Sequence, residues 1–204
     1  MPQPIFRSLV LLLLLSLGLS LTVLTTPAQS CVGKTLVIGS TGTVQQDLLA
    51  EIISLLIGER TGTTVKVIRV ASPQAAHAAL LKADLDISVE STGAGQLEAF
   101  NGEPISDPRA LSEAVKSRYN EELNLIWLQP FGFDEPRAVQ TSIPAQVAPV
   151  VRKDTLKKFS ALTRLSNKLG GTIDSATMQR LEAQAATGKV REVARSFLKE
   201  NRLI

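Results

Sequence analysis

The feature that most constrains the fold is an alternation of short apolar runs with helical segments from residue 35 onward. Residues 35–39, 65–70 and 84–89 are runs typical of strands, the first buried on both faces. Between them, residues 44–58 carry a helical apolar face, and residues 73–82 form an alanine-rich helix. This order predicts a sheet of parallel strands joined by right-handed crossovers.

The second half of the chain turns from this alternation to helices. Residues 109–122 predict a helix and residues 123–128 a fourth strand. From residue 131 to 149, three prolines (Pro136, Pro144 and Pro149) permit only short strands or loop. The final third is predicted to be helical over residues 155–168, 175–186 and 190–200. We therefore expect an α/β fold with a mostly parallel sheet flanked by helices and a helical C-terminal third.

Four loops follow the predicted strands, and ligands of open parallel sheets bind at that edge. The loops are residues 40–43, 71–73, 90–93 and 131–134. The first three are small and polar, whereas the fourth carries two aromatic side chains. The first loop lacks the Lys of a phosphate-binding loop and the glycines of a dinucleotide site, so an ordinary turn with a helix cap is the alternative to an anion cradle.

The first thirty residues predict an export signal. Arg7 is the only charged residue before Lys34, and it precedes an apolar run over residues 9–21 and a small-residue stretch that ends at Ser30. The apolar span is shorter than the roughly twenty residues of a membrane-crossing helix. We expect residues 1–30 to be a signal peptide and residues 31–204 to be one periplasmic or otherwise extracytoplasmic domain.

Cys31 comes directly after the predicted signal, with small residues, Ala28 and Ser30, at the two positions that a signal peptidase inspects. Bacterial lipoproteins have this arrangement, with the cysteine acylated as the new N-terminus, although a larger aliphatic residue is usual at the place of Ala28. Two outcomes stay open: a lipid anchor on Cys31, or a soluble protein that begins there.

Composition narrows the chemistry. The 204 residues contain one Cys and one His, which excludes an internal disulfide framework and a Cys/His zinc site. The histidine, His77, lies mid-helix among alanines, and a structural or exposed role is favoured over a catalytic one. The formal charge of +3 is scattered, so no nucleic-acid partner is predicted. We expect no cofactor or metal, and Glu90 with Asp86 in a carboxylate-dependent hydrolase is the enzymatic alternative.

Five segments together resemble the substrate-binding proteins of ABC importers for glycine betaine, choline, carnitine and related osmoprotectants. They are residues 34–40, 85–93, 125–133, 148–156 and 190–200. The resemblance implies a lobe of the type II periplasmic-binding-protein fold that is not an enzyme. It also implies a small polar or quaternary-ammonium solute as ligand and ABC permease subunits as partners.

The loops and the resemblance together predict the ligand-binding residues, which are Ser40, Thr41, Gly42, Thr43, Glu90, Ser91, Thr92, Gly93 and Phe133. Structural alternatives stay open for two of them, because Glu90 can cap the turn that follows it and Phe133 can plug the end of the sheet. Trp127 alternates within a predicted strand and is expected in the core.

Two departures from the family pattern follow from the same comparison. Family members usually have a second α/β lobe where this chain has only residues 140–147, so we expect a single lobe. The aromatic cage that holds a quaternary ammonium by cation–π contact is reduced as well. Thr43, Ser88 and Ser91 stand at aromatic positions, and Arg137 replaces a tyrosine.

These departures leave two functions from different classes open. The first is a solute-binding component of an ABC transporter, whose single lobe would leave about half of the ligand in water and weaken binding. The second is an interaction or regulatory protein that kept the lobe as a scaffold without transport. In either case an exposed cleft surface predicts self-association, for example as a homodimer.

Overall fold

The computed structural model describes residues 35–135 and 145–204. These residues belong to one compact unit, Cys31–Ile204. The predicted signal peptide, Cys31 and Arg137 lie outside the described residues, so the predictions that concern them stay predictions.

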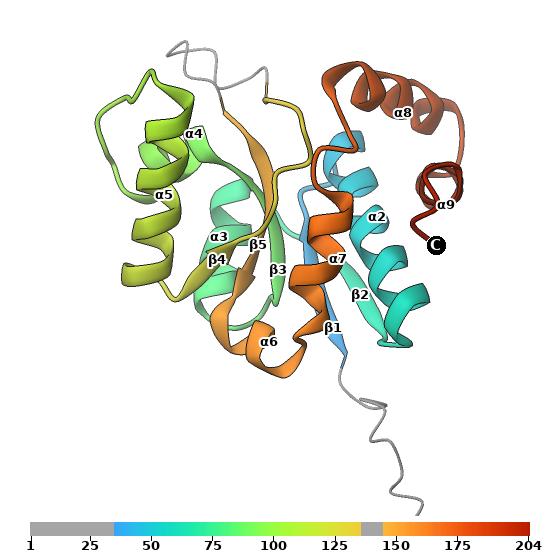
Figure 1. The fold of residues 1–204 in the computed structure, drawn as a ribbon, viewed down its shortest axis with the longest axis horizontal. Coiled ribbons are helices and arrows are strands. Elements are labelled where there is room, and N and C mark those ends of the chain that lie inside the picture. Colours follow the sequence, from blue (N-terminus) through green and yellow to red (C-terminus); the bar gives the residue numbers. More distant parts are fainter. Residues whose placement is uncertain (1–34, 136–144) are drawn as a thin grey trace, which may run out of the picture. The chain divides into compact units, whose positions relative to one another are not determined.

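Five strands form one mixed sheet (Figure 1). β1 (Leu36–Ser40) pairs in parallel with β2 (Val65–Arg69) on one side and with β3 (Ile87–Ser91) on the other. β5 (Val147–Arg152) lies antiparallel between β3 and β4 (Leu125–Trp127), which gives the order β2-β1-β3-β5-β4. The predicted α/β class and its βαβαβ start are confirmed. β1, β2, β3 and β4 run in the same direction, as expected for a mostly parallel sheet, and β5 alone runs against its neighbours.

β5 is a short strand, as the prolines were expected to permit before residue 150, but it lies inside the sheet. Pro149 lies in the middle of this six-residue strand, opposite Val89 of β3. A proline cannot donate to a strand ladder, but it still accepts, and the Pro149 carbonyl takes the N–H of Leu128 at 2.9 Å. The valines around Pro149 are buried on both faces of the sheet and hold the strand in place.

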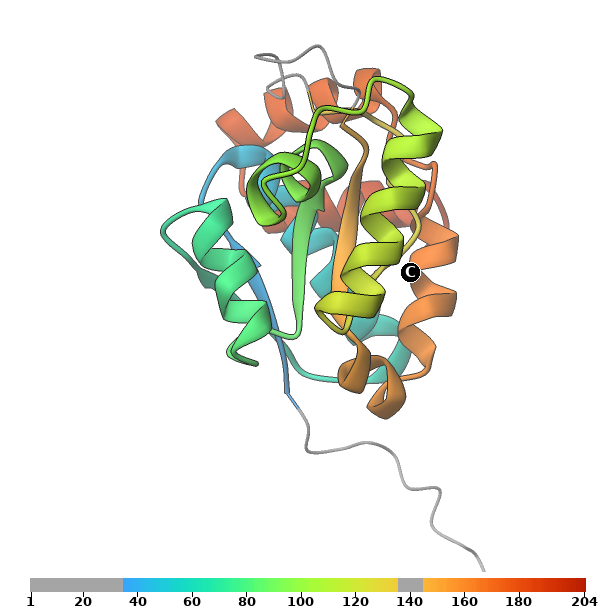
Figure 2. The same ribbon diagram turned by 90° about the vertical axis from the view of Figure 1, so that its left-hand side faces the viewer.

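Helices cover both faces of the sheet (Figures 1 and 2). α3 (Pro73–Leu81) and α5 (Pro108–Glu122) pack on one face, together with Ala148 and Val150 of β5. α2 (Val44–Thr61) packs on the other face, where Val147 and Val151 point. Successive side chains of β5 thus enter two separate cores, as the period of two in a strand requires.

The predicted C-terminal helices are confirmed with one change. The expected helix over residues 155–168 is two helices, α6 (Lys153–Lys158) and α7 (Ala161–Leu169), separated at Phe159, whose backbone leaves the helical region. α8 (Ser175–Thr187) and α9 (Val190–Glu200) then pack with α7 over α2. In the part of the chain that the structure describes, no helix combines the length and the apolar character needed to cross a membrane.

Candidate functional site

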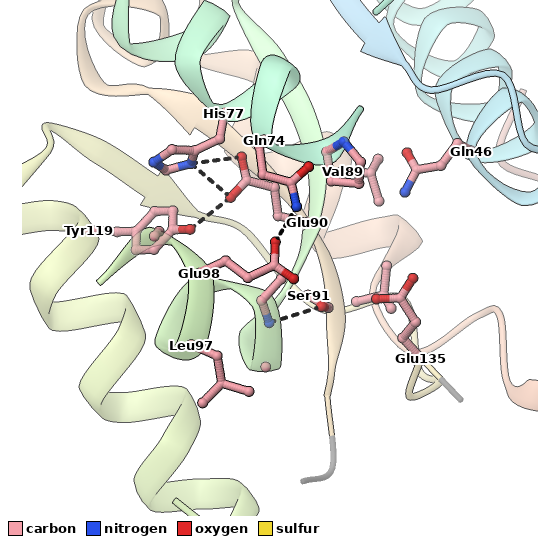
Figure 3. A pocket seen from close by; sticks show the side chains of 15 residues that line it. Gln46, Gln74, His77, Val89, Glu90, Ser91, Leu97, Glu98, Tyr119 and Glu135 are labelled. Carbon is pink, nitrogen blue, oxygen red and sulfur yellow. Dashed lines mark hydrogen bonds and ion pairs between the residues drawn. The ribbon is translucent and has the colours of Figure 1, made fainter. Parts of the chain in front are cut away.

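A pocket of about 290 Å³ lies where the parallel strands end (Figure 3). Its walls come from the first turns of α2 and α3, from the end of β3, from α5 and from the segment after β3. That segment is a short turn, α4 (Thr92–Ala94), continued by a π-helical turn, η1 (Gly95–Ala99). Both the position at the carboxyl edge and the π-helical turn are common at ligand sites, and the volume is near the lower end for small-molecule pockets, about 300 Å³.

Glu90 is the polar centre of this pocket. It is the fourth residue of β3, so its side chain points away from the core that holds Val89 and toward α3 and α5. The Tyr119 hydroxyl donates to Glu90 Oε2 at 2.8 Å, and His77 Nδ1 lies 3.3 Å from each carboxylate oxygen. The Glu90 side chain is only 10% exposed, so both donors compensate for the water that the carboxylate has lost.

His77 reaches Glu90 because of the phase of α3. Ser72 caps this helix by accepting the N–H of Ala75, and Pro73 begins it. Ala76 and Leu80 then face the core, which places His77 beside the edge of the sheet, with its side chain 18% exposed. The hydrogen bond to Glu90 raises the pKa of His77 above its ordinary value, against the opposing effect of burial, and the charge of Glu90 raises it further.

Tyr119 is buried at the centre of an aromatic cluster. Its ring makes edge contacts with His77, Phe100 and Trp127, at centroid distances of 5.5, 5.3 and 5.2 Å. Burial, and then the neighbouring charge of Glu90, raise the pKa of Tyr119 far above its usual range. The hydroxyl is therefore a permanent neutral donor to the carboxylate.

The charges around the pocket are almost all of one sign. Glu90, Glu98 and Glu135 line it, and Gln74 Nε2 donates to Glu98 Oε2 at 2.7 Å. Figure 3 shows His77 and Tyr119 directed at Glu90, and Gln74 directed at Glu98. No lysine or arginine is among the described residues that line the pocket, which leaves His77 as the one lining side chain there that can become a cation. A site of this kind attracts a cationic group.

The predicted ligand residues are divided by the structure. Glu90, Ser91 and Gly93 line the pocket, and Ser91 also caps α4 by accepting the N–H of Ala94. Thr92 is buried beside them but is not part of the lining. Whether the three lining residues contact a ligand stays a prediction.

The loop Ser40–Thr43 is not part of the pocket lining, and its side chains form hydrogen bonds with the start of α2 instead. The Ser40 hydroxyl donates to Asp47 at 2.6 Å and accepts the N–H of Gly42, while Thr43 caps α2. Asp47, which also pairs with Arg69 at 2.9 Å, supplies the negative charge at this helix N-terminus. The structure thus favours the alternative of an ordinary capped turn.

Phe133, predicted as a ligand-binding residue, and Trp127, expected in the core, are both core residues. Phe133 is 6% exposed, stacks on Phe131 at a centroid distance of 6.3 Å and packs in the core beneath α2, so it fills the sheet end and does not line the pocket. Trp127 is buried against Tyr119, as expected.

Several lining residues were missed by sequence reasoning, chief among them His77, Tyr119, Gln74 and Glu98. His77 was expected to be structural or exposed, and its hydrogen-bonded position against Glu90 is compatible with a structural role, but its place in the pocket wall was not foreseen. For Tyr119 a signal existed, because Leu111, Val115 and Tyr119 repeat every four residues and mark the buried stripe of α5. No local pattern pairs that stripe with Glu90.

The parallel β1–β3 core, with helices on both faces and a pocket at its carboxyl edge, defines a lobe of the type II periplasmic-binding-protein fold, a class of solute-binding proteins. The chain belongs to the family described as the substrate binding domain of ABC-type glycine betaine transport system (OpuAC), whose model matches residues 34–139 and 134–200.

Individual relatives agree with this assignment. The carnitine transport binding protein OpuCC of Listeria monocytogenes is 28% identical over 183 residues, which cover 86% of this chain and 56% of the relative. The ergothioneine transport permease/ergothioneine binding protein EgtU of Helicobacter pylori is 26% identical over 139 residues, 68% of this chain and 24% of that protein. This chain thus spans about half the length of its carnitine-binding relative.

Solved structures show the same fold. A crystal structure of a glycine betaine/carnitine/choline ABC transporter superposes with a TM-score of 0.76 at 16% identity, over 82% of this chain and 99% of that chain. Apo YehZ from Escherichia coli superposes with a TM-score of 0.74 at 17% identity, over 84% of this chain and 100% of that chain. At these identities the likeness concerns the fold alone.

Proposed function

We propose that this chain is an extracytoplasmic solute-binding component of an ABC importer, and that the Glu90 pocket holds the cationic group of a small quaternary-ammonium solute. Family membership supports the class of function. The ligand class is inferred from the residues that line the pocket. They include three carboxylates and the buried Tyr119, and no lysine or arginine is among the described ones.

Recognition of the cation rests on charge more than on an aromatic cage. Phe133 and Trp127 are buried in the two cores, and Ser88 and Ser91 have no aromatic ring with which to form cation–π contacts. The carboxylates of Glu90, Glu98 and Glu135 supply the attraction instead. Attraction between partly exposed charges is screened by salt, so we expect affinity to fall as ionic strength rises.

Calorimetric titration tests the ligand class most directly with a matched pair of molecules. Choline carries a trimethylammonium group, and 3,3-dimethylbutan-1-ol has nearly the same shape without the charge. We expect binding of choline, or of carnitine or glycine betaine, and no binding of the uncharged analogue. Equal binding of choline and its uncharged analogue would contradict a charge-selective pocket.

Two glutamate variants test whether the solute binds in the Glu90 pocket. Glu90→Gln removes one charge and keeps the shape, and we expect affinity to fall by about tenfold or more, as for loss of a partly buried charge partner. Glu113→Gln is the matched control, because Glu113 is an exposed carboxylate of α5 that is not part of the lining. No heat with any of the three cations in the unaltered protein would overturn the proposal.

The anchor, the permease and self-association belong to the same proposal. Acylation of Cys31 predicts a lipid mass on the N-terminal peptide that Cys31→Ala abolishes. Docking on an ABC permease predicts recovery of transporter subunits with the protein after cross-linking in membranes. A homodimer predicts twice the monomer mass by light scattering at high concentration. A stable partner unrelated to importers would instead favour the scaffold function.

A further inference from the structure

His77 and Glu90 form a pair inside the pocket wall. His77 Nδ1 lies 3.3 Å from both carboxylate oxygens, and the two side chains are 18% and 10% exposed. Both residues line the pocket, so a solute that approaches Glu90 also approaches His77. A protonated imidazole is a cation, so protonated His77 pairs with Glu90 in the same way as the cationic group of a solute would.

We propose that His77 is a built-in competitor for Glu90, so that binding of a cationic solute displaces the His77 proton into solvent. The inference rests on the proposed function, because it requires a cationic solute at Glu90. With His77 protonated, the pair is neutral and the solute faces a second positive charge a few ångströms away. With His77 neutral, Nδ1–H still donates to Glu90 and the carboxylate keeps its charge for the solute.

The groups that face His77 leave Glu90 as its charged partner. Tyr119, from α5, contacts the imidazole through its ring edge and stays neutral. Glu98, from η1, accepts a hydrogen bond from Gln74 of the same helix as His77. Glu135 lines the same pocket and adds a further negative charge. The hydrogen bond to Glu90 and its charge favour the protonated imidazole in the empty pocket, and a bound cation opposes it.

The direction of the pH dependence follows from linkage. The proton binds more tightly to the empty protein than to the solute complex, so solute affinity falls as pH drops below the His77 pKa of the empty protein. For one displaced proton, the dissociation constant rises by at most about tenfold per pH unit below that pKa and is constant above it.

Nuclear magnetic resonance can follow this proton directly, because His77 is the only histidine in the chain. The full chain is produced in an exporting host with a tag free of histidine, and the imidazole signals are followed between about pH 5 and 8.5. We expect the pKa of His77 to fall on saturation with choline, carnitine or glycine betaine, none of which changes charge in this range. We also expect it to fall in Glu90→Gln without any solute.

Calorimetry in two buffers of different ionisation enthalpy counts the released protons. Near the His77 pKa we expect up to about one proton released per solute bound. His77→Gln keeps a hydrogen-bond donor and cannot titrate, so it is expected to release none and to bind equally well at both ends of the pH range. Glu113→Gln is expected to behave as the unaltered protein.

The outcomes separate the two proposals. Binding that is independent of pH, with an unchanged His77 pKa, overturns proton displacement and leaves the proposed function intact. If none of the three solutes binds at any pH up to about 8.5, the proposed function fails and the displacement falls with it.

Discussion

At the scale of single residues, Glu90 is held by two donors of different character. Tyr119 donates at 2.8 Å and stays neutral over the whole physiological range. The hydrogen bond to Glu90 raises the pKa of His77, which is the partner that can change its charge. One carboxylate is thus positioned by a fixed donor and tuned by a variable one.

Tyr119→Phe tests the fixed donor. The substitution keeps the ring in its aromatic cluster and removes the hydrogen bond to Glu90. We expect the free energy of unfolding to fall by about 1.5–3 kcal/mol, the range for a hydrogen bond to a charged group. Urea denaturation of the ligand-free protein measures it, and unchanged stability would show that the hydroxyl is dispensable to the fold.

The pair also predicts how stability depends on pH. The folded protein raises the pKa of His77 above its value of 6.5 in the unfolded chain, chiefly through the hydrogen bond to Glu90. The resulting stabilisation is therefore complete below the unfolded value and is lost as pH rises through the folded value. We expect His77→Gln to lack this contribution, so that its melting temperature falls less than that of the unaltered protein between about pH 6 and 8.5. Parallel melting curves would contradict the assignment.

Sequence reasoning located the pocket better than its contents. The order of strands and loops placed Glu90, Ser91 and Gly93 at the carboxyl edge, and the structure puts all three in the wall. The sequence could not identify His77 as a pocket residue, because a histidine among alanines does not show which element its side of the helix contacts. Contacts of this kind depend on how helices are rotated over a sheet, which local patterns leave undetermined.

At the scale of elements, local periodicity predicted the helices well and the sheet less well. The bounds of α9 match the prediction. β3 begins at Ile87, later than its apolar run, because Asp86 accepts the N–H of Val37 at 3.0 Å and the Thr155 hydroxyl at 2.8 Å. The segment of β5 was predicted as short strands or loop, and its central place in the sheet was not predicted because its pairing partners lie far along the chain.

Two substitutions in α9 separate apolar packing from surface charge. Phe197 is fully buried in the core over α2, and Phe197→Ala is expected to lower the free energy of unfolding by about 3–5 kcal/mol. Arg195 forms an exposed ion pair with Glu59 at 2.6 Å, and Arg195→Ala is expected to lower it by less than about 1 kcal/mol. Chemical denaturation of both variants checks the ranking, and equal losses would refute it.

At the scale of the whole molecule, the two segments that match the family model build one sheet together. β5 comes from the second segment, yet it lies between β3 and β4 of the first. The sequence predicted the single lobe from the short stretch at residues 140–147, and this remains a prediction about how the chain differs from its relatives.

The short stretch at residues 140–147 can be tested by inserting a domain there. We expect a small folded domain placed between Val139 and Gln140 to leave the melting temperature within a few degrees, since doubling a loop costs only about 0.6 kcal/mol. The same domain placed after Ser91, at the pocket wall, is expected to unfold the lobe or abolish solute binding. Thermal melting of the two insertions measures the difference, and equal damage would contradict it.

The residues on either side of the connection are tied to each other. Asp134 and Gln146 form an isolated antiparallel bridge, and the N–H of Glu135 donates to the Ala145 carbonyl at 2.8 Å. With both ends fixed in register, a gene can gain or lose a coding segment there in frame while every strand keeps its neighbours. If relatives with two lobes share this pairing, it marks the position where a second lobe could be inserted without altering the sheet that carries Glu90.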